Sequence, residues 1–531
     1  MSERTRYIIH IGAQALPDLE AKLPKAEQYV HLTEPTDTIV VDSEEDPLPL
    51  FGKRGLQSVF RNALFLLDKT ATILDQPDLL TQLPANGIVL DEKITLTGEA
   101  ADVLKLKQAV ILNIFDTKSL ADHIVHDWFG GQEGLKIDPD SVTVAPSFHG
   151  TIQQTGHVEV AYTGQFGDEW TPLIYWRMTA WLIHDRYLHF WPECTYSAQT
   201  ADIRFVVTMM DMQTGEVTQT ITLDGKDADQ GVTFFSTEKD QVFGVQMLAK
   251  GHGTIHLGQL HLRHARRQYG VMFQGGQRLT TADPLNSELM VYFDAGDLKP
   301  PLNVYFSGYR TAEGFEGNFM MQTLGAPFLL ICDSRLEGGG FYYGNEELEQ
   351  AVKKTIQQTL QRLQFRPDQL ILSGISMGTT PALYYGAQIK PRGIIVGKPL
   401  VNVGSIAENA RIRRPNDFET ALDVVLAQEG NTTPTSAETL NQRFWNVFKQ
   451  GDFTKTTIAI AYMLQDDYDR EAFPDMYQYL TGGEKNVRLL HKGRIGRHND
   501  DTTGVINWFL QQYKLILSDQ FGRTFEQGAS E

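Results

Sequence analysis

The pattern of hydrophobic and polar positions changes twice along the chain and divides it into three parts. Up to residue 145, apolar runs such as RYIIHIG and AVILNIFD are typical of buried strands, whereas LQSVFRNALFLLDKTATIL carries apolar residues at helical spacing. Strands that alternate with helices predict an N-terminal α/β region over residues 1–145.

In residues 146–285 the pattern changes to short runs in which apolar and polar residues alternate, such as HVEVAYTG, IRFVVTMMD, VTQTITLDG and GTIHLGQLHLR. This period of two, with turn signals between the runs, predicts a β-sandwich with the shape of a carbohydrate-binding module. Four of the seven tryptophans lie between Trp170 and Trp191. Such residues pack in sandwich cores or form platforms for sugar rings, and we favour the core.

Residues 286–531 return to an α/β pattern. Six short apolar runs, LNVYFSG, PFLLICD, QLILSG, RGIIVGKP, TIAIAYML and NVRLLHKG, predict strands of a largely parallel sheet that is covered on both faces. After the second run, NEELEQAVKKTIQQTLQRLQF predicts a helix, because apolar residues recur every three or four positions from Leu348 to Leu363. Asn345 is suited to cap its first turn.

The segment LSGISMG places Ser376 between two glycines where a predicted strand gives way to a helix. This is the nucleophile-elbow pattern G-x-S-x-G of α/β-hydrolases, whose tight turn needs residues without clashing side chains. We therefore predict an α/β-hydrolase-like catalytic domain over residues 286–531, with Ser376 as the nucleophile. The backbone N–H of Met377 is one predicted oxyanion donor, and the loop after LNVYFSG, at Gly308 or Tyr309, is expected to supply another.

A serine hydroxyl needs a base, and the base needs an acid to orient it. His498, in the loop ahead of the C-terminal helix, is the predicted base, whereas His491 lies in the last residues of a predicted strand and is expected to be structural. The acid is expected after the preceding strand, where QDDYD offers Asp466, Asp467 and Asp469. Asp466 is the first choice and Asp467 the second.

Composition narrows the possible functions. The 531 residues, with 41% hydrophobic and 21% charged, are typical of a globular protein of two or three domains, and a net charge of −19 argues against a nucleic-acid partner. The start MSERTRYIIHIGAQ lacks the apolar run of a secretory signal, and no stretch is long enough to span a membrane, so we expect a cytoplasmic protein. Cys194 and Cys332 are expected to be buried and unpaired.

Two polar stretches receive structural interpretations. GHGTIHLGQLHLRH contains His252, His256, His261 and His264, but it has the look of a hairpin and has no carboxylate or cysteine at ligand spacing, so no metal site is expected. The basic stretch RHARRQ that overlaps its end is expected to be a solvated edge or a partner contact.

Seven motifs, in order along the chain, resemble a known family. They are ELMVYFDAGDLKPPLNVYFSGYRTAEGFEGNFMM, DSRLEGGGFYYGN, SGISMGT, VGKPL, LNQRFW, AIAYMLQDDYD and GRHND, and the resemblance as a whole runs through most of residues 140–515. The family is that of the second of the three accessory secretory proteins in the accessory Sec export system of Gram-positive bacteria. Over the first 140 residues the resemblance is slight.

The resemblance implies a cytosolic protein, or one peripheral to the inner face of the cell membrane, that takes part in exporting serine-rich glycoprotein adhesins. Its implied partners are the other two accessory secretory proteins, the accessory Sec motor ATPase and the adhesin. It also implies serine-dependent O-acetylation of N-acetylglucosamine on the adhesin, with the family's triad falling on Ser376, His498 and, within QDDYD, Asp466.

Three functional hypotheses follow. The leading one is a serine acyltransferase that passes an acetyl group through acetyl-Ser376 to a sugar hydroxyl. The same residues can instead hydrolyse an acetyl or carbohydrate ester, because water and sugar compete for the acyl group. The third hypothesis is a non-catalytic export scaffold. The sequence does not define the acyl donor; acetyl-CoA is the donor we consider, and neither a tightly bound cofactor nor a metal is expected.

Overall fold

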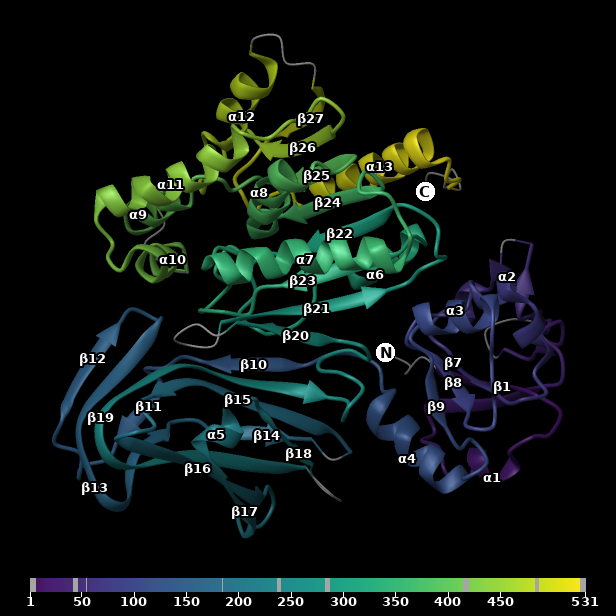
Figure 1. Ribbon diagram of the computed structural model, residues 1–531, viewed down its shortest axis with the longest axis horizontal. Helices are drawn as coiled ribbons and strands as arrows, with labels where there is room; N and C mark the ends of the chain where they lie inside the picture. The colour runs from purple at the N-terminus through teal and green to yellow at the C-terminus, as the bar shows by residue number, and fades with distance from the viewer. Residues whose placement is uncertain are drawn as a thin grey trace.

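The structure, a computed structural model, describes residues 6–41, 46–53, 55–183, 185–235, 240–281, 287–413, 420–482 and 487–525. Figure 1 shows three groups of elements, each built on a sheet of its own, with five, ten and eight strands. The predicted boundary at residues 285/286 lies outside the described residues. The boundary at residues 145/146 remains a prediction, and two strands that precede it, β10 and β11, pair with the second sheet.

The first group is a parallel sheet in the order β2-β1-β7-β8-β9 with short helices around it. Its elements are β1 (Arg6–Ile11), α1 (Pro17–Glu20), β2 (Glu27–Leu32), β3 (Thr38–Ile39), β4 (Leu48–Pro49), β5 (Phe51–Gly52), β6 (Gly55–Leu56), the 3-10 helix η1 (Ser58–Phe60), β7 (Leu64–Leu67), the 3-10 helix η2 (Thr72–Asp75), α2 (Pro77–Leu80), β8 (Ile88–Asp91), α3 (Glu99–Leu106), β9 (Val110–Leu112) and α4 (Thr117–Asp127).

The helix predicted over LQSVFRNALFLLDKTATIL is wrong. Its middle forms the strand β7, which lies between β1 and β8, and all four residues of β7 are buried. A contiguous apolar run suits a central parallel strand, because such a strand is covered on both faces, whereas a surface helix keeps a polar side.

The second group is one antiparallel sheet that folds back on itself to make two layers. Its elements are β10 (Gly134–Ile137), β11 (Val142–Val144), β12 (Thr151–Thr155), β13 (Glu159–Trp176), β14 (Ala180–Leu182), β15 (Tyr187–Tyr196), β16 (Ala201–Asp211), β17 (Val217–Asp224), α5 (Gly225–Ala228), β18 (Val232–Phe235) and β19 (Gln241–Ala265). The long strand β19 pairs with β16 along its first half and with β15 along its second. Phe190 of β15 meets Phe205 of β16 in the core, with ring centroids 5.8 Å apart.

Glycine allows β19 to pass from one layer to the other. Gly251, at the change of partner, has φ +86°, and a Cβ there would lie 2.1 Å from the carbonyl oxygen of Thr200. A larger residue would therefore meet both backbone strain and a backbone clash. The four histidines expected in a hairpin lie instead in this single strand of 25 residues, so the hairpin prediction is wrong.

Two of the four tryptophans lie in the core, as favoured, and two do not. Trp176 and Trp191 are buried, whereas Trp181 is 65% exposed. The guanidinium carbon of Arg204 lies over the ring of Trp170, 4.1 Å from the ring centroid.

The prediction that RHARRQ is a solvated edge is wrong for two of its three arginines. The side chains of Arg263 and Arg266 are buried. The guanidinium of Arg263 pairs with the carboxylates of Glu288 and Glu313, which belong to the third group. These partners are far from the arginine in sequence, and they make burial of the charge tolerable.

The third group is a sheet in the order β20-β21-β23-β22-β24-β25-β26-β27, in which β22 to β27 are parallel. Its strands are β20 (Gln277–Thr280), β21 (Glu288–Asp294), β22 (Leu302–Phe306), β23 (Phe328–Cys332), β24 (Leu370–Ile375), β25 (Gly393–Gly397), β26 (Thr457–Met463) and β27 (Arg488–Arg494). Its helices are α6 (Asn318–Leu324), α7 (Glu346–Arg362), the 3-10 helix η3 (Ser376–Gly378), α8 (Thr379–Ile389), α9 (Val403–Arg413), α10 (Thr420–Glu429), α11 (Pro434–Phe448), α12 (Ala472–Thr481) and α13 (Thr502–Phe521).

The six predicted strands of this part all form, and helices cover both faces of the sheet. The apolar side chains of α7, α8, α11 and α12 share one core with one face. Those of α6 and α13 share another core with the opposite face. The predicted helix α7 is present, and the side chain of Asn345 accepts the backbone N–H of Leu348 at 2.8 Å as its cap. The result is the predicted three-layer α/β arrangement.

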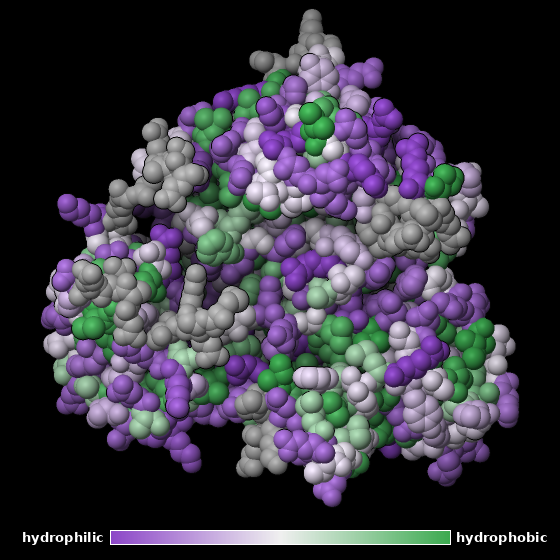
Figure 2. Space-filling view, turned by 180° about the vertical axis from the view of Figure 1, so that it is seen from behind, coloured by the Kyte–Doolittle hydropathy of each residue, from purple (hydrophilic) through white to green (hydrophobic). Residues whose placement is uncertain are grey.

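Three further facts concern the helices, the surface and the cysteines. Within the described ranges, no helix is both long enough and apolar enough to cross a membrane. Figure 2 shows one face of the molecule, on which hydrophobic residues form separate groups among hydrophilic ones. Cys194 and Cys332 are buried and unpaired, as predicted.

Candidate active site

Ser376 follows β24 directly, at the carboxyl edge of the parallel part of the sheet. Its φ of +55° is in the left-handed region, which turns the chain sharply out of the strand. A Cβ on Gly374 would lie 2.1 Å from the carbonyl oxygen of Gly378, and one on Gly378 would lie 2.1 Å from that of Phe306. Both glycines of the motif are therefore required by close backbone approach.

His498 and Asp466 come to Ser376 from two later loops. Ser376 Oγ lies 2.9 Å from His498 Nε2, and His498 Nδ1 lies 2.9 Å from Asp466 Oδ2. Both His498 and Asp466 are buried. Because the carboxylate accepts a hydrogen bond from Nδ1–H, Nε2 carries the lone pair that can accept the serine proton. This geometry can activate a hydroxyl for attack on an acyl carbon.

The other two carboxylates of QDDYD have different partners. Asp467 accepts the backbone N–H of His498 at 3.0 Å and pairs with Arg497, and although burial alone would raise the pKa of Asp467, these contacts lower it. Asp469 accepts the backbone N–H groups of Val401 and Asn402, both at 2.7 Å, and burial raises its pKa. Both carboxylates hold loops and neither contacts the imidazole nitrogens.

The loop after β22 lies beside Ser376, and its backbone is held by Glu316. The N–H of Gly308 donates to Glu316 Oε2 at 2.7 Å, and the Tyr305 hydroxyl lies 3.4 Å from the same oxygen. In this arrangement the Gly308 N–H already has an acceptor. Tyr309 lines the cavity beside Ser376, and Met377 follows the serine in η3, so both remain predicted oxyanion donors.

A cavity of about 510 Å³ opens above Ser376. Its lining residues come from the ends of β22 and β24, from the loops after β22, β24, β25, β26 and β27, and from α6 and the start of α13. They are Tyr305, Gly308, Tyr309, Glu316, Gly317, Met320, Ile375, Ser376, Lys398, Tyr468, His498, Asn499, Thr502 and Ile506. The ring of Tyr468 lies against the imidazole of His498, with centroids 4.4 Å apart. A cavity of this size suits a small organic ligand.

Sequence reasoning missed two charged residues of this cavity, Glu316 and Lys398. Lys398 is the first residue after β25, so its position at the carboxyl end of a parallel strand was a usable signal. Glu316 lies in a long loop, and nothing local in the sequence points to its contact with Gly308.

The remaining histidine candidates lie outside this cavity. His491 is on β27 and packs against the rings of Phe473 and Tyr477, at 5.2 and 5.5 Å. His261, in β19, lies between the carboxylates of Glu193 and Glu313. Across the described part of the chain, no group of three or more histidine, cysteine or acidic residues is arranged to hold a metal ion.

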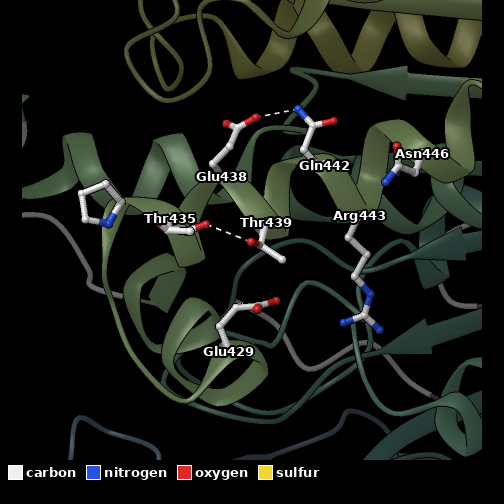
Figure 3. Close-up of a pocket in the computed structure, with 8 residues that line it drawn as sticks. Glu429, Thr435, Glu438, Thr439, Gln442, Arg443 and Asn446 are labelled. Atoms are coloured by element: carbon white, nitrogen blue, oxygen red, sulfur yellow. Dashed lines mark hydrogen bonds between the residues drawn. The ribbon is translucent and has the colours of Figure 1, made fainter.

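Another hollow, of about 750 Å³, runs along α11 (Figure 3). Two of the hydrogen bonds there join residues of α11 to each other: Gln442 donates to Glu438 at 2.5 Å, and Thr439 donates to the carbonyl oxygen of Thr435 at 2.9 Å. Its lining residues contain no nucleophile and base in contact. The cavity above Ser376 is therefore the better candidate for chemistry.

Comparisons with known proteins place the chain in a family. Residues 40–523 match the family model described as accessory Sec system GspB-transporter. The second accessory secretory protein of Staphylococcus aureus (strain NCTC 8325 / PS 47) is 43% identical over 74% of this chain and 75% of its own. That of Streptococcus gordonii is 36% identical over 86% of this chain and 90% of its own.

One solved structure is similar to this chain over almost its whole length. A chain of the glycosylation-associated protein complex Gap123 from Streptococcus agalactiae is 33% identical, with a TM-score of 0.84, over 99% of this chain and 100% of that one. The match covers all three groups of elements, including the N-terminal one, which contains none of the seven motifs. The chain belongs to the family of the second accessory secretory protein, a component of the accessory Sec system.

Proposed function

We propose that this protein is a serine-dependent O-acetyltransferase that acetylates N-acetylglucosamine on a serine-rich adhesin exported by the accessory Sec system. The observation that supports this most is the chain of two 2.9 Å contacts from Ser376 Oγ through the imidazole of His498 to Asp466, beside a cavity. Such a chain activates a hydroxyl for acyl chemistry.

The first half-reaction forms the acetyl-enzyme. Ser376 Oγ attacks the carbonyl carbon of the acetyl donor while His498 Nε2 takes the hydroxyl proton, and Asp466 stabilises the imidazolium. The oxyanion is held by backbone N–H groups, for which Met377 and Tyr309 are the candidates. The carbonyl re-forms as the bond to the leaving group breaks, and the leaving group takes the proton from His498. We consider acetyl-CoA as the donor, so the leaving group is its thiol.

The second half-reaction passes the acetyl group to the sugar. An acceptor hydroxyl gives its proton to His498 Nε2 and attacks the acetyl carbon, and Ser376 Oγ leaves with that proton. Atoms and charges balance without metal or redox chemistry. Water in place of the sugar gives hydrolysis, so the cavity must favour the sugar for transfer to prevail.

The test uses purified full-length protein, a chromogenic acetate ester as donor and a serine-rich peptide carrying N-acetylglucosamine as acceptor. We expect the ester to be consumed and acetyl to appear on the sugar. S376A should lower both rates by about a millionfold, to background, as for other serine enzymes. Acetylated sugar formed equally by S376A would refute the proposal.

An esterase that uses the same residues is the second candidate, and the same assay separates the two. Ester consumption that releases free acetate, with no acetyl on the sugar at any acceptor concentration, would favour the esterase. We further propose a cytoplasmic location, at times peripheral to the membrane, with the other two accessory secretory proteins, the motor ATPase and the adhesin as partners. The Gap123 match, a chain from a complex, supports assembly with the first two.

The scaffold hypothesis predicts a different phenotype. If the protein serves export chiefly as a scaffold, S376A should secrete adhesin at the wild-type level while deletion of the whole chain blocks secretion. Measuring secreted adhesin and its acetyl content in the same strains separates the two roles, because catalysis and scaffolding can coexist in one protein.

A further inference from the structure

Two side chains of opposite charge face the Ser376 cavity without pairing with each other. Glu316 and Lys398 both line it, yet no ion pair joins them anywhere in the described ranges. A lysine and a carboxylate that share one small cavity would gain from direct contact. That they are held apart leaves a space with a hydrogen-bond donor on one side and an acceptor on the other.

Lys398 stands beside the nucleophile. Ile375 and Gly397 are paired neighbours at the ends of the adjacent parallel strands β24 and β25. Ser376 and Lys398 are the residues that immediately follow these two strands. Both have φ of +55°. This turn at the carboxyl end of β25 brings the lysine side chain to the same cavity that the elbow opens onto.

The ammonium of Lys398 is buried but only partly satisfied. The residue is 4% exposed, and Nζ donates to Thr502 Oγ1 at 3.1 Å. An ammonium has three donors, and Thr502 takes one. Burial lowers the pKa of Lys398, an effect that the carboxylates of Asp466, Glu316 and Asp501 oppose.

The carboxylate of Glu316 has one oxygen engaged and one available. Oε2 accepts the Gly308 N–H and lies near the Tyr305 hydroxyl, and the backbone N–H of Glu316 donates to Ser307 Oγ at 3.1 Å. Oε1 makes no hydrogen bond to any residue that the structure describes. These contacts fix the carboxylate, so Oε1 is a positioned acceptor rather than a mobile one.

A ligand that fits between them must offer both an acceptor and a donor. An anionic ligand would be repelled by Glu316 and a cationic one by Lys398, so the pair favours a neutral polar group. An acetamido group has a carbonyl oxygen for the ammonium and an N–H for the carboxylate. A plain hydroxyl also offers a donor and an acceptor, but both lie on one oxygen atom, whereas the acetamido group presents them on two atoms and can bridge side chains that do not pair.

We propose that Lys398 and Glu316 bind the acetamido group of the acceptor sugar, and so select N-acetylated amino sugars over plain hexoses. This assignment rests on the proposed acetyltransferase function, since it names the acceptor subsite of that reaction. Holding the acetamido group beside Ser376 places a neighbouring sugar hydroxyl near His498 Nε2. The bound sugar also occupies the space that water would need, which favours transfer over hydrolysis.

The test measures binding in the S376A background, where no acetyl transfer competes. Full-length S376A is titrated calorimetrically with a serine-rich peptide carrying a single O-linked N-acetylglucosamine, and with the same peptide carrying glucose. We expect the amino-sugar peptide to bind more tightly. Adding K398M should weaken it by about 10- to 100-fold, the effect of losing a charge-assisted hydrogen bond, and should abolish the preference over glucose.

Two further variants sharpen the result. E316Q keeps the shape of the side chain but removes its charge, and it should also reduce the preference for the amino sugar. The matched control is K390M, because Lys390 is an exposed lysine at the end of α8 that pairs with Asp452 at 3.7 Å, outside the cavity. K390M should bind as the S376A parent does, and circular dichroism checks that each variant is folded.

The outcomes separate this inference from the proposed function. Equal affinity of the S376A parent, K398M and E316Q for the amino-sugar peptide, or no binding by the parent, would overturn the subsite. If wild-type protein fails to transfer acetyl but its binding depends on Lys398, the chemistry is wrong and the subsite stands. If acetyl transfer occurs and neither K398M nor E316Q changes the affinity for the amino-sugar peptide, only the subsite is wrong.

Discussion

Asp466, Asp467 and Asp469 follow the same strand, but each carboxylate accepts hydrogen bonds from a different part of the molecule. Asp466 reaches His498 Nδ1, Asp467 holds the backbone at His498, and Asp469 holds the loop at residues 401–402. The sequence could predict that an acid lies after β26, because parallel strands end at one edge of a sheet. The first choice, Asp466, is the carboxylate that contacts His498 Nδ1, but the partners that distinguish the three lie far away along the chain and cannot be read from the sequence.

This division predicts different effects for two similar substitutions. D466N leaves the shape intact but removes the charge that fixes the imidazole tautomer, so we expect acetyl transfer to fall by about four orders of magnitude. D467N should cost far less, because Asp467 accepts hydrogen bonds from the backbone N–H of His498 and the side chain of Arg497 and not from the imidazole. Steady-state rates with the chromogenic ester compare them. A larger loss for D467N would contradict the assignment of the acid.

Individual elements were predictable where local signals agreed and unpredictable where burial overrode them. The helix α7 has a cap at Asn345, an apolar stripe and acidic residues in its first turn, and all of these point to the same structure. The strand β7 was misread as a helix because its apolar run is compatible with both structures. Only its position between two other strands, which is a long-range property, decides between them.

Capping gives a test at the level of the element. N345A removes the acceptor for the Leu348 N–H, so the first turn of α7 loses a hydrogen bond that its own helix cannot replace. We expect the free energy of unfolding to fall by about 1 kcal/mol. Urea denaturation measures this, and N345D, which keeps an acceptor, is the control. An unchanged stability for N345A would show that solvent satisfies this N–H equally well.

Over the whole molecule, a buried ionic cluster joins the second sheet to the loop beside the active site. Arg263 of β19 pairs with Glu288 of β21 and with Glu313, which lies between Gly308 and Glu316 in sequence. His261 pairs with the same Glu313. No sequence pattern predicted this cluster, because a basic run is usually solvated. Charges that meet across two sheets can be recognised only in the folded chain.

Breaking this cluster should be costly. R263M leaves two buried carboxylates without their main cation, so we expect a loss of about 3–5 kcal/mol in the free energy of unfolding. R366M is the matched control, since Arg366 pairs with Asp368 on the exposed surface and should contribute about 0–1 kcal/mol. Denaturant unfolding of both variants makes the comparison. Equal effects would mean that the buried cluster contributes no more than a surface pair.

The same region predicts how stability depends on pH. Burial, followed by the nearby cations Arg263 and Arg278, lowers the pKa of His189 from 6.5 to about 3. Between these values the unfolded chain binds a proton that the folded chain does not, so stability falls as pH drops below 6.5. The loss from this residue is about 1.4 kcal/mol per pH unit. H189Q should have a shallower slope in denaturant unfolding between pH 6.5 and 5, and an unchanged slope would contradict the shift.

The central claim is that Ser376 carries the acetyl group between donor and sugar. The most direct measurement is mass spectrometry of protein mixed briefly with an acetate ester, quenched in acid, digested and mapped. We predict one added acetyl group on the peptide that contains Ser376, lost again when the N-acetylglucosaminyl peptide is added before the quench. Acetyl groups found only on other residues, with Ser376 unmodified while the ester is consumed, would contradict the account.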